Sequence, residues 1–153
     1  MSAVLPPGVV IRAATAADLP AIEALLGGSG LSAQGVEEQL AGFTVAETNG
    51  AIAGSAGLEL YAGDALLRSL CVAPAWRGKG LGAHLVEHML TEGALQAVDD
   101  VYLLTMDAER FFARFGFLTV SRRDLPFTVS RAVTRAGGCP DTATPMHLRL
   151  ALP

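Results

Sequence analysis

The sequence predicts an α/β fold in which a mixed, mostly antiparallel central sheet carries helices on both faces. Its 153 residues are 51% hydrophobic, which suits a single domain over residues 1–153 with one core. Hairpin signals occupy the middle of the chain, where strands follow one another directly. Helical patterns separate the later strands, which favours crossover connections and therefore a mixed sheet.

The strand candidates share β-branched residues or an alternation of apolar and polar residues. They are residues 9–11, 43–47, 51–60, 66–72, 101–105, 118–120 and 146–152. The helix candidates share apolar residues at three- and four-residue spacing. They are residues 19–26, 33–40, 81–93, 111–115 and 126–135. The expected order is therefore β-α-α-β-β-β-α-β-α-β-α-β.

Turn and cap residues mark the ends of several of these elements. Thr15 and Asp18 have the spacing of a capping box before the first helix. Asn49-Gly50 is the strongest short hairpin signal in the chain, and Gly63-Asp64 is expected to turn the chain into the following strand. Asp107 is expected to cap the short aromatic helix.

A basic, glycine-rich turn lies between the strand that ends at Val72 and the next helix. It consists of Arg77, Gly78, Lys79, Gly80, Leu81 and Gly82. A helix start offers unpaired N–H groups and positive partial charge, and glycines let the backbone approach an anion closely. With its two cations, the turn predicts a diphosphate site. Lys79 is followed by Gly80 rather than by Ser or Thr, and the glycines do not fit G-x-G-x-x-G, which excludes a Walker loop and a Rossmann fingerprint.

The same six residues resemble the R/Q-x-x-G-x-G/A pyrophosphate loop of the GNAT N-acetyltransferases, which bind acetyl-coenzyme A. The order of elements from Val10 to Leu152 is also similar to the GNAT order. The resemblance implies acetyl-coenzyme A as co-substrate, with its diphosphate on the turn and its pantetheine arm along Leu70 and Val72. It further implies a backbone N–H near Cys71 or Val72 for the thioester oxygen, and direct attack without a covalent enzyme intermediate.

Acyl transfer to an amine requires that the amine be neutral, and Glu59 is our candidate general base, directly or through a water. It lies on the face of its strand opposite Leu58 and Leu60, and GNAT enzymes often place a base carboxylate on one of these central strands. Two other interpretations stay open at this point: Glu59 is a solvated surface residue, or it is an ion-pair partner of Arg68.

Arg68 and Ser69 are candidate substrate-binding residues. Arg68 lies in the otherwise apolar strand beside the expected acetyl site, and a buried arginine needs anionic partners. It is expected to grip a carboxylate or oxyanion of the acceptor, with the Ser69 hydroxyl beside it. The alternatives are a salt bridge to Glu59 and an outward-facing arginine with an apolar stem.

The chain departs from the GNAT pattern at one position. Many GNAT enzymes have a tyrosine here as general acid to the departing thiolate, and Phe112 stands in its place. Phenylalanine cannot donate a proton, so Tyr102, water or bulk solvent must do so. Phe112 also favours one rival function, a coenzyme A-binding sensor domain without catalysis. A second rival is a protein N-terminal or lysine acetyltransferase, which the arginine-rich C-terminal part disfavours.

Four short segments are similar to the arsenic-resistance N-acetyltransferase branch of the GNAT enzymes. They are Gly57-Leu58-Glu59, Leu66-Leu67-Arg68-Ser69, Leu103-Leu104-Thr105 and Cys139-Pro140. This resemblance implies a small anionic acceptor with a free amine, such as an amino-acid-like arsenical or phosphinate, and a role in resistance or detoxification. Cys139 is either a contact for a trivalent arsenical or a small buried hydrophobe.

Composition excludes several other classes of partner. The net charge of −4 argues against general nucleic-acid binding, and no apolar run approaches the ~20 residues of a membrane span. The first residues lack the features of a secretory signal, and two cysteines imply no disulfide framework, so we expect a cytoplasmic protein. His84 and His88 have no third ligand in view, so we expect no metal. We expect a monomer or a homodimer.

Overall fold

The computed structural model describes residues 4–136 and 142–150. Seven strands form one sheet in the order β1-β2-β3-β4-β5-β7-β6. The strands are β1 (Val9–Ala13), β2 (Phe43–Thr48), β3 (Ala51–Tyr61), β4 (Asp64–Val72), β5 (Asp100–Thr105), β6 (Leu118–Thr119) and β7 (Thr144–Arg149). Every neighbouring pair is antiparallel except β4 and β5, which run parallel. The mixed, mostly antiparallel sheet expected from the sequence is confirmed.

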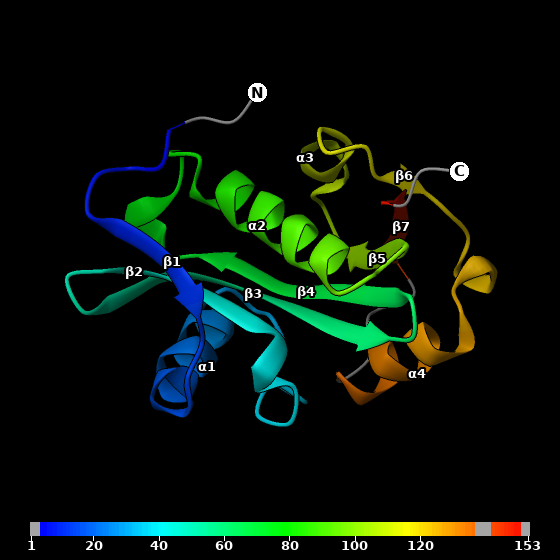
Figure 1. The fold of residues 1–153 in the computed structure, drawn as a ribbon, viewed down its shortest axis with the longest axis horizontal. Helices are drawn as coiled ribbons and strands as arrows, with labels where there is room; N and C mark the ends of the chain where they lie inside the picture. The colour runs from blue at the N-terminus through cyan, green and yellow to red at the C-terminus, as the bar shows by residue number, and fades with distance from the viewer. Residues whose placement is uncertain (1–3, 137–141, 151–153) are drawn as a thin grey trace.

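Helices cover both faces of this sheet (Figure 1). They are α1 (Leu19–Gly28), α2 (Leu81–Leu95), α3 (Glu109–Ala113) and α4 (Phe127–Arg135). α2 and α3 lie on one face, and α1 and α4 lie on the other, with the segment before β2 between them. The face under α2 holds the largest core cluster, with Leu85, Val86 and Phe117 fully buried. Smaller apolar clusters lie under α1 and α4, so the sheet is buried on both sides.

Several cap and turn predictions are confirmed. Thr15 and Asp18 form a capping box around a short 3-10 turn that leads into α1. Asn49 and Gly50 both have positive φ, as the hairpin turn between β2 and β3 requires.

Three local predictions are wrong. Residues 33–40 were expected to be helical, but they form turns followed by a 3-10 turn at Leu40–Gly42, because Gly35 takes a φ of +79° and interrupts any helix. The hairpin after β3 turns at residues 62–63, both of which have positive φ, so β4 begins already at Asp64. Asp107 does not cap α3.

The cap of α3 comes from the end of β5 instead. The hydroxyl of Thr105 accepts a hydrogen bond from the backbone N–H of Ala108, 3.0 Å away, just before the helix begins at Glu109. A side-chain oxygen three residues ahead of an unpaired N–H satisfies the same requirement that an Asp cap would. The strand therefore supplies the start of the helix that follows it.

A buried carboxylate ties the N-terminal strand to α1. Asp18 accepts hydrogen bonds from Arg12 at 2.7 and 2.9 Å and from the backbone N–H of Thr15 at 2.7 Å. The Arg12 hydrogen bonds lower the pKa of Asp18, against the opposing effect of burial. The capping box thus also anchors β1.

We expect Asp18→Asn to lower the free energy of unfolding by about 2 kcal/mol at pH 7. The variant removes the negative charge that the Arg12 guanidinium and the Thr15 N–H bind, and leaves these donors in place. A carboxyl whose pKa falls on folding stabilises the protein above its unfolded pKa. The difference between wild type and variant should therefore be full above pH of about 5 and shrink as the pH falls below about 4. Urea titrations at several pH values measure it. Asp107→Asn removes a carboxylate that does not cap α3 and should change the free energy of unfolding by less than about 0.5 kcal/mol.

Candidate active site

The parallel strands β4 and β5 pair over only three residues each and then part. Asp64, Ala65 and Leu66 pair with Asp100, Val101 and Tyr102. Beyond that point β4 stays with β3 and β5 stays with β7. A cavity of about 600 Å³ lies between them, lined by residues 66–72 of β4 and 103–108 at the end of β5, with Phe111 and Phe112 of α3. The exposed edge of β4 therefore faces a largely apolar cleft.

A bulge distorts β4 where it borders this cleft. Gly57 pairs with Arg68 and Ser55 pairs with Cys71, so two β4 residues lie opposite a single β3 residue. One of the two, Ser69, takes a φ of +58°. The buried hydroxyl of Ser55 donates to the Ser69 carbonyl at 2.9 Å and holds the bulge in place. The irregularity lies one residue before Leu70, at the strand edge expected to hold the pantetheine arm.

The glycine-rich turn closes one end of the cleft and leads into the fifteen-residue helix α2. Gly78 and Gly80 have φ values of +78° and +82°, a conformation in which other residues are strained. A side chain at Gly82 would lie 3.6 to 3.7 Å from Phe111 and Val72, both of which line the cleft. Gly78 and Gly80 thus give the turn its positive-φ backbone, and Gly82 lies beside the cleft wall.

The two cations of the turn have different environments. Arg77 donates from Nε to the Val72 carbonyl at 3.0 Å and from Nη2 to the Ser29 hydroxyl at 3.3 Å, so it ties the turn to β4 and to the end of α1. Lys79 lies with Nζ 6.0 Å from the Trp76 ring centroid and makes no ion pair within residues 4–136 and 142–150. An open helix start beside an unpaired lysine fits a diphosphate, and the β4 edge fits an arm that carries amide groups. These residues therefore suit coenzyme A.

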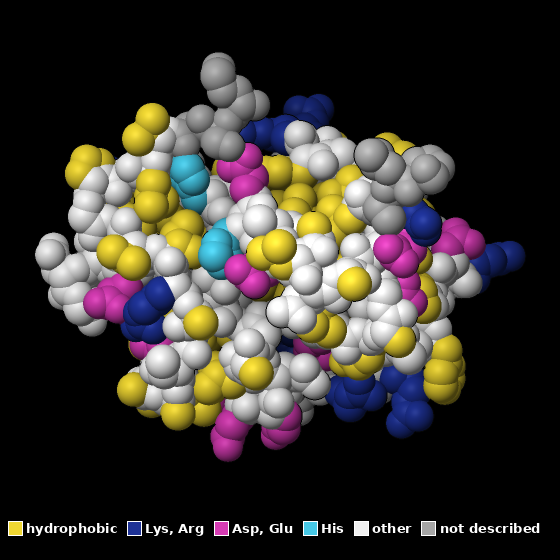
Figure 2. Space-filling view, viewed as in Figure 1, with side chains coloured by type: hydrophobic (Ala, Val, Ile, Leu, Met, Phe, Trp, Pro, Cys, Tyr) yellow, Lys and Arg dark blue, Asp and Glu magenta, His cyan; other side chains and the backbone are white. Residues whose placement is uncertain are grey.

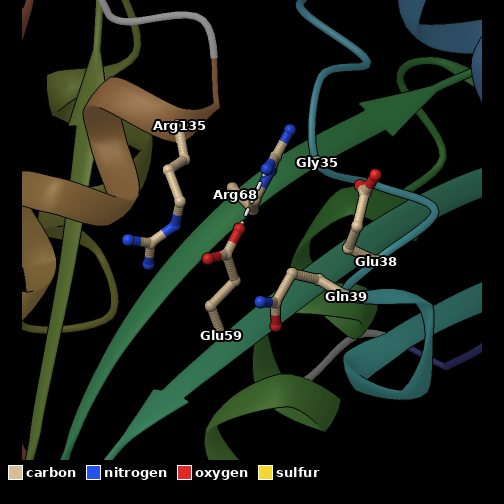
Figure 3. Close-up of a pocket in the computed structure, with 6 residues that line it drawn as sticks. All are labelled: Gly35, Glu38, Gln39, Glu59, Arg68 and Arg135. Carbon is tan, nitrogen blue, oxygen red and sulfur yellow. Dashed lines mark hydrogen bonds and ion pairs between the residues drawn. The ribbon is translucent and has the colours of Figure 1, made fainter.

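A second, smaller cavity of about 280 Å³ adjoins the cleft (Figure 3). Its lining consists of Gly35, Glu38, Gln39, Glu59, Arg68 and Arg135. Glu59 and Arg68 come from β3 and β4, Arg135 comes from α4, and the other three come from the turn segment before β2. Arg68 lines both cavities, so the two meet at this side chain.

Arg68 and Glu59 form a buried ion pair, one of the alternatives that the sequence left open. Arg68 Nη1 lies 2.9 Å from Glu59 Oε2, and their side chains are 8% and 3% exposed. Arg68 also donates from Nη2 to the Gln34 carbonyl at 2.7 Å and from Nε to the Ser69 hydroxyl at 3.0 Å. Each of its three nitrogens is thus engaged inside the protein. Arg68 holds Glu59, the bulge and the turn segment together at the junction of the cavities.

Two residues that the sequence did not single out complete this network. Tyr61 donates its hydroxyl hydrogen to Glu59 Oε1 at 2.5 Å and accepts from Arg135 Nη2 at 2.9 Å. Burial and the bond to Glu59 raise the pKa of Tyr61. Tyr61 follows Glu59 by two positions on one strand, so the period-two rule places both on one face and could have indicated it. No local pattern indicates Arg135, which lies 74 residues from Tyr61.

Arg135 is the cation of the smaller cavity without a carboxylate partner among the described residues. Its guanidinium lies 5.8 Å from the Tyr61 ring centroid. Figure 2 shows Lys and Arg side chains over α4 and acidic side chains over the neighbouring turn segment, at the lower edge of the molecule in this view. The cavity is thus bordered by Arg135 on one side and by Glu38 on the other.

The larger cleft has no tyrosine among its described lining residues. Phe112 lines it, is 7% exposed and packs edge-to-face on Phe111 and Phe117. Tyr102 instead stacks on His147 with 4.7 Å between ring centroids and packs in the cluster under α4. The geometry therefore does not favour Tyr102 as the proton donor to the thiolate.

Cys71 and the histidines of α2 form no metal site among the described residues. Cys71 is buried in the cleft wall, with Sγ 2.9 Å from the Ser29 hydroxyl, and Cys139 lies outside the described residues. No group of three metal-ligating side chains occurs in the described part of the chain; His88 lies 3.9 Å from Glu92 on α2. None of the described helices has the length and apolar character of a membrane span.

Comparisons with known proteins agree with this geometry. The family model for the acetyltransferase (GNAT) domain matches residues 39–118. An uncharacterized N-acetyltransferase of Chlorobaculum tepidum is 30% identical over 138 residues, which are 85% of this chain and 86% of that protein. An amino-acid acetyltransferase of Vibrio atlanticus is 29% identical over 97 residues, 62% of this chain. This chain spans only 22% of that relative's length.

Solved structures give the same result. N-acetylglutamate synthase from Neisseria gonorrhoeae, complexed with coenzyme A and N-acetyl-glutamate, superposes with a TM-score of 0.80 at 27% identity. The match covers 94% of this chain and 35% of that one. A Mycobacterium tuberculosis protein in complex with coenzyme A has the same fold, with a TM-score of 0.76 and 24% identity over 93% of this chain and 99% of that one. Motif, fold and relatives agree: the chain belongs to the GNAT acetyltransferase family.

Proposed function

We propose that this protein transfers the acetyl group of acetyl-coenzyme A to the primary amine of a small acceptor that carries a carboxylate. One observation carries this proposal: the coenzyme-sized cleft and a small, charged cavity meet at Arg68, with Glu59 at the junction. A donor and an acceptor placed in the two cavities would meet beside a carboxylate. The amino-acid acetyltransferases among the relatives support an acceptor of this class.

The donor would lie along the larger cleft. We assign its diphosphate to residues 77–82 and its pantetheine arm to the β4 edge at Leu70 and Val72, which pairs with none of the described strands on the cleft side. The thioester oxygen would then lie near the backbone N–H of Cys71 or Val72. A fixed N–H donor stabilises the negative charge that develops on this oxygen during attack.

The transfer itself would be a direct attack. The amine nitrogen forms a bond to the thioester carbonyl carbon, the carbon–sulfur bond breaks, and coenzyme A leaves as a thiolate. The nitrogen releases one proton as it becomes the amide, and this proton passes to the thiolate through water or to solvent. The ammonium form of the acceptor must first lose a proton, which Glu59 accepts directly or through a water. A carboxylate has roughly four lone-pair positions, so Glu59 can receive this proton while Tyr61 and Arg68 remain hydrogen-bonded.

The acceptor carboxylate would bind at Arg135. Arg68 already donates from all three of its nitrogens, whereas Arg135 donates only to the Tyr61 hydroxyl within the described residues. A guanidinium presents a fork of N–H donors that matches a carboxylate. Arg68 and Ser69 would then border the acceptor on the side of the thioester. A cavity of about 280 Å³ suits a molecule the size of an amino acid.

Within this class we propose an amino-acid-like arsenical or phosphinate as one acceptor, and resistance or detoxification as the setting. Such a molecule carries a free amine and a carboxylate, as the arrangement of Glu59 and Arg135 requires. We propose action in the cytoplasm.

Two measurements test the function. Calorimetry with acetyl-coenzyme A measures donor binding, and a thiol-release assay measures turnover with glutamate, other amino acids, their amides, and phosphinate and arsenical amino acids. Turnover with the acids but not with the amides supports the proposal. Turnover only with peptide N-termini or lysine peptides would replace it by protein acetylation. Tight binding with no turnover on any acceptor would favour a sensor domain.

Gly80→Glu should abolish detectable binding of acetyl-coenzyme A, because the variant places a negative charge and a strained residue at the start of α2. Ala94→Glu adds the same charge to the exposed C-terminal end of the same helix and should leave the dissociation constant unchanged. Calorimetry on both variants checks this. Equal affinities would exclude the turn as the diphosphate site.

Glu59→Gln should lower kcat by about 10²- to 10⁴-fold, the usual contribution of a general base, with unchanged affinity for acetyl-coenzyme A. Glu37→Gln, at an exposed position of the turn segment, serves as the control and should leave kcat unchanged. Steady-state kinetics with the best acceptor measures both. A Glu59 variant with wild-type kcat would remove this residue from the proton transfer.

Arg135→Met should raise the acceptor KM about 10-fold or more, the equivalent of one charge-assisted hydrogen bond. Arg131→Met removes an arginine one turn earlier on α4, where it lies over the Phe127 ring, and should leave KM unchanged. The comparison uses an acceptor and its amide. If Arg135→Met raises the KM of the acceptor and of its amide equally, the guanidinium does not bind the acceptor carboxylate.

A further inference from the structure

Tyr61 connects two residues that line the smaller cavity, Glu59 and Arg135. Its hydroxyl is 2.9 Å from Arg135 Nη2 on α4 and 2.5 Å from Glu59 Oε1 on its own strand. The second oxygen of Glu59 is 2.9 Å from Arg68 Nη1 on β4. Both oxygens of the carboxylate are therefore held by donors from two different strands, and one of these donors also contacts the helix that borders the cavity.

The direction of these hydrogen bonds is fixed by the chemistry of the groups. A guanidinium has only donors and an ionised carboxylate has only acceptors, so the hydroxyl must accept from Arg135 and donate to Glu59. Burial and the carboxylate raise the pKa of Tyr61, so the hydroxyl keeps its proton at neutral pH. A hydroxyl that donates to an anion while it accepts from a cation is polarised in one direction.

We propose that Tyr61 is a positioning residue: through its hydroxyl it orients the Glu59 carboxylate, favours its charged form, and connects it to the acceptor-binding Arg135. This inference rests on the proposed function and extends it to a residue that does not touch the reacting atoms. A carboxylate with one donor on each oxygen cannot rotate freely, so its remaining lone pairs keep a fixed direction. An acceptor carboxylate bound to Arg135 would thus be connected to Glu59 through the Tyr61 hydroxyl.

Tyr61→Phe should lower kcat about 10-fold and leave the affinity for acetyl-coenzyme A unchanged. The acid limb of the kcat/KM profile, which reports deprotonation of the base, should move up by about one pH unit, because the carboxylate loses a donor that favours its charge. Tyr102→Phe removes the hydroxyl of the other tyrosine in the sequence and should move neither quantity. A Tyr61→Phe variant with wild-type kcat and an unmoved limb would overturn the proposal.

The charged groups around Glu59 are Arg68 on β4, Arg135 on α4 and Glu38 on the turn segment. Glu38 is a second carboxyl that lines the smaller cavity, so the profile is repeated in a Glu38→Gln background. A limb that persists there and still responds to Tyr61→Phe belongs to Glu59. A limb that disappears in this background belongs to Glu38 and contradicts the assignment.

A direct titration separates this inference from the proposed function. The carboxyl ¹³C signal of Glu59, assigned with Glu59→Gln, is followed against pH by NMR in wild type and Tyr61→Phe. A midpoint about one pH unit higher in the variant supports the positioning role even if no acceptor is ever turned over. An identical midpoint overturns it even if the enzyme is active.

Fluorine substitution gives a second test that does not depend on the folding of Tyr61→Phe. In a Tyr102→Phe background, Tyr61 is the one tyrosine of the sequence, so biosynthetic 3-fluorotyrosine enters at position 61 alone. The fluorinated hydroxyl is a stronger donor of nearly the same size. It should lower the Glu59 midpoint, opposite to Tyr61→Phe. A midpoint that does not move, or that rises, contradicts a donor role.

Discussion

The point at which β4 and β5 stop pairing determines where the larger cleft and the free edge of β4 lie. Their parallel ladder ends at Leu66 and Tyr102, because each strand then follows its other neighbour. A twisted sheet cannot keep both pairings once the two strands turn apart. The opening leaves one edge of β4 unpaired by any described strand, creates the larger cleft, and places α3 in its wall. The bulge at Ser69 lies on the same edge, so the irregular backbone is concentrated where a ligand could use it.

Burying the charged network at the junction of the two cavities opposes folding, so its presence calls for an explanation other than stability. Moving a guanidinium and a carboxylate out of water opposes folding, and an ion pair repays that cost only with good geometry and further hydrogen bonds. Arg68 and Glu59 have both: each Arg68 nitrogen donates, and each Glu59 oxygen accepts. Apolar side chains would fill the same space at lower cost. The network is thus better explained by the orientation of Glu59 than by stability.

The sequence predicted those elements whose structure depends on a local pattern of residues. The glycine-rich turn, the alternation in the strands and the helical stripe of α2 all predicted their elements, and the capping box at Thr15 formed as expected. The turn segment at 33–40 was misjudged because Gly35 at positive φ outweighs an apolar pattern of helical type. The ion pair between Glu59 and Arg68 could not be decided, because it depends on the register of β3 against β4. With the turn at residues 62–63, Glu59 lies opposite Leu66 and diagonal to Arg68. The contact of Arg135 with Tyr61 depends on how α4 packs, which no spacing encodes.

The two cavities differ in how much of their lining lies within the residues matched by the family model. The residues matched by the family model, 39–118, contain most of the larger cleft's lining, including the β4 edge, Arg77 and the aromatic helix, while residues 29–32, 133, 136 and 143 complete it. Half of the smaller cavity's lining lies outside that range, since Gly35 and Glu38 precede it and Arg135 follows it. Substitutions at Gly35, Glu38 and Arg135 would alter which molecule fits the smaller cavity without changing a residue that lines the larger cleft. New acceptors could therefore be acquired by substitutions at a few positions around the smaller cavity, while the interior of the sheet stays as it is.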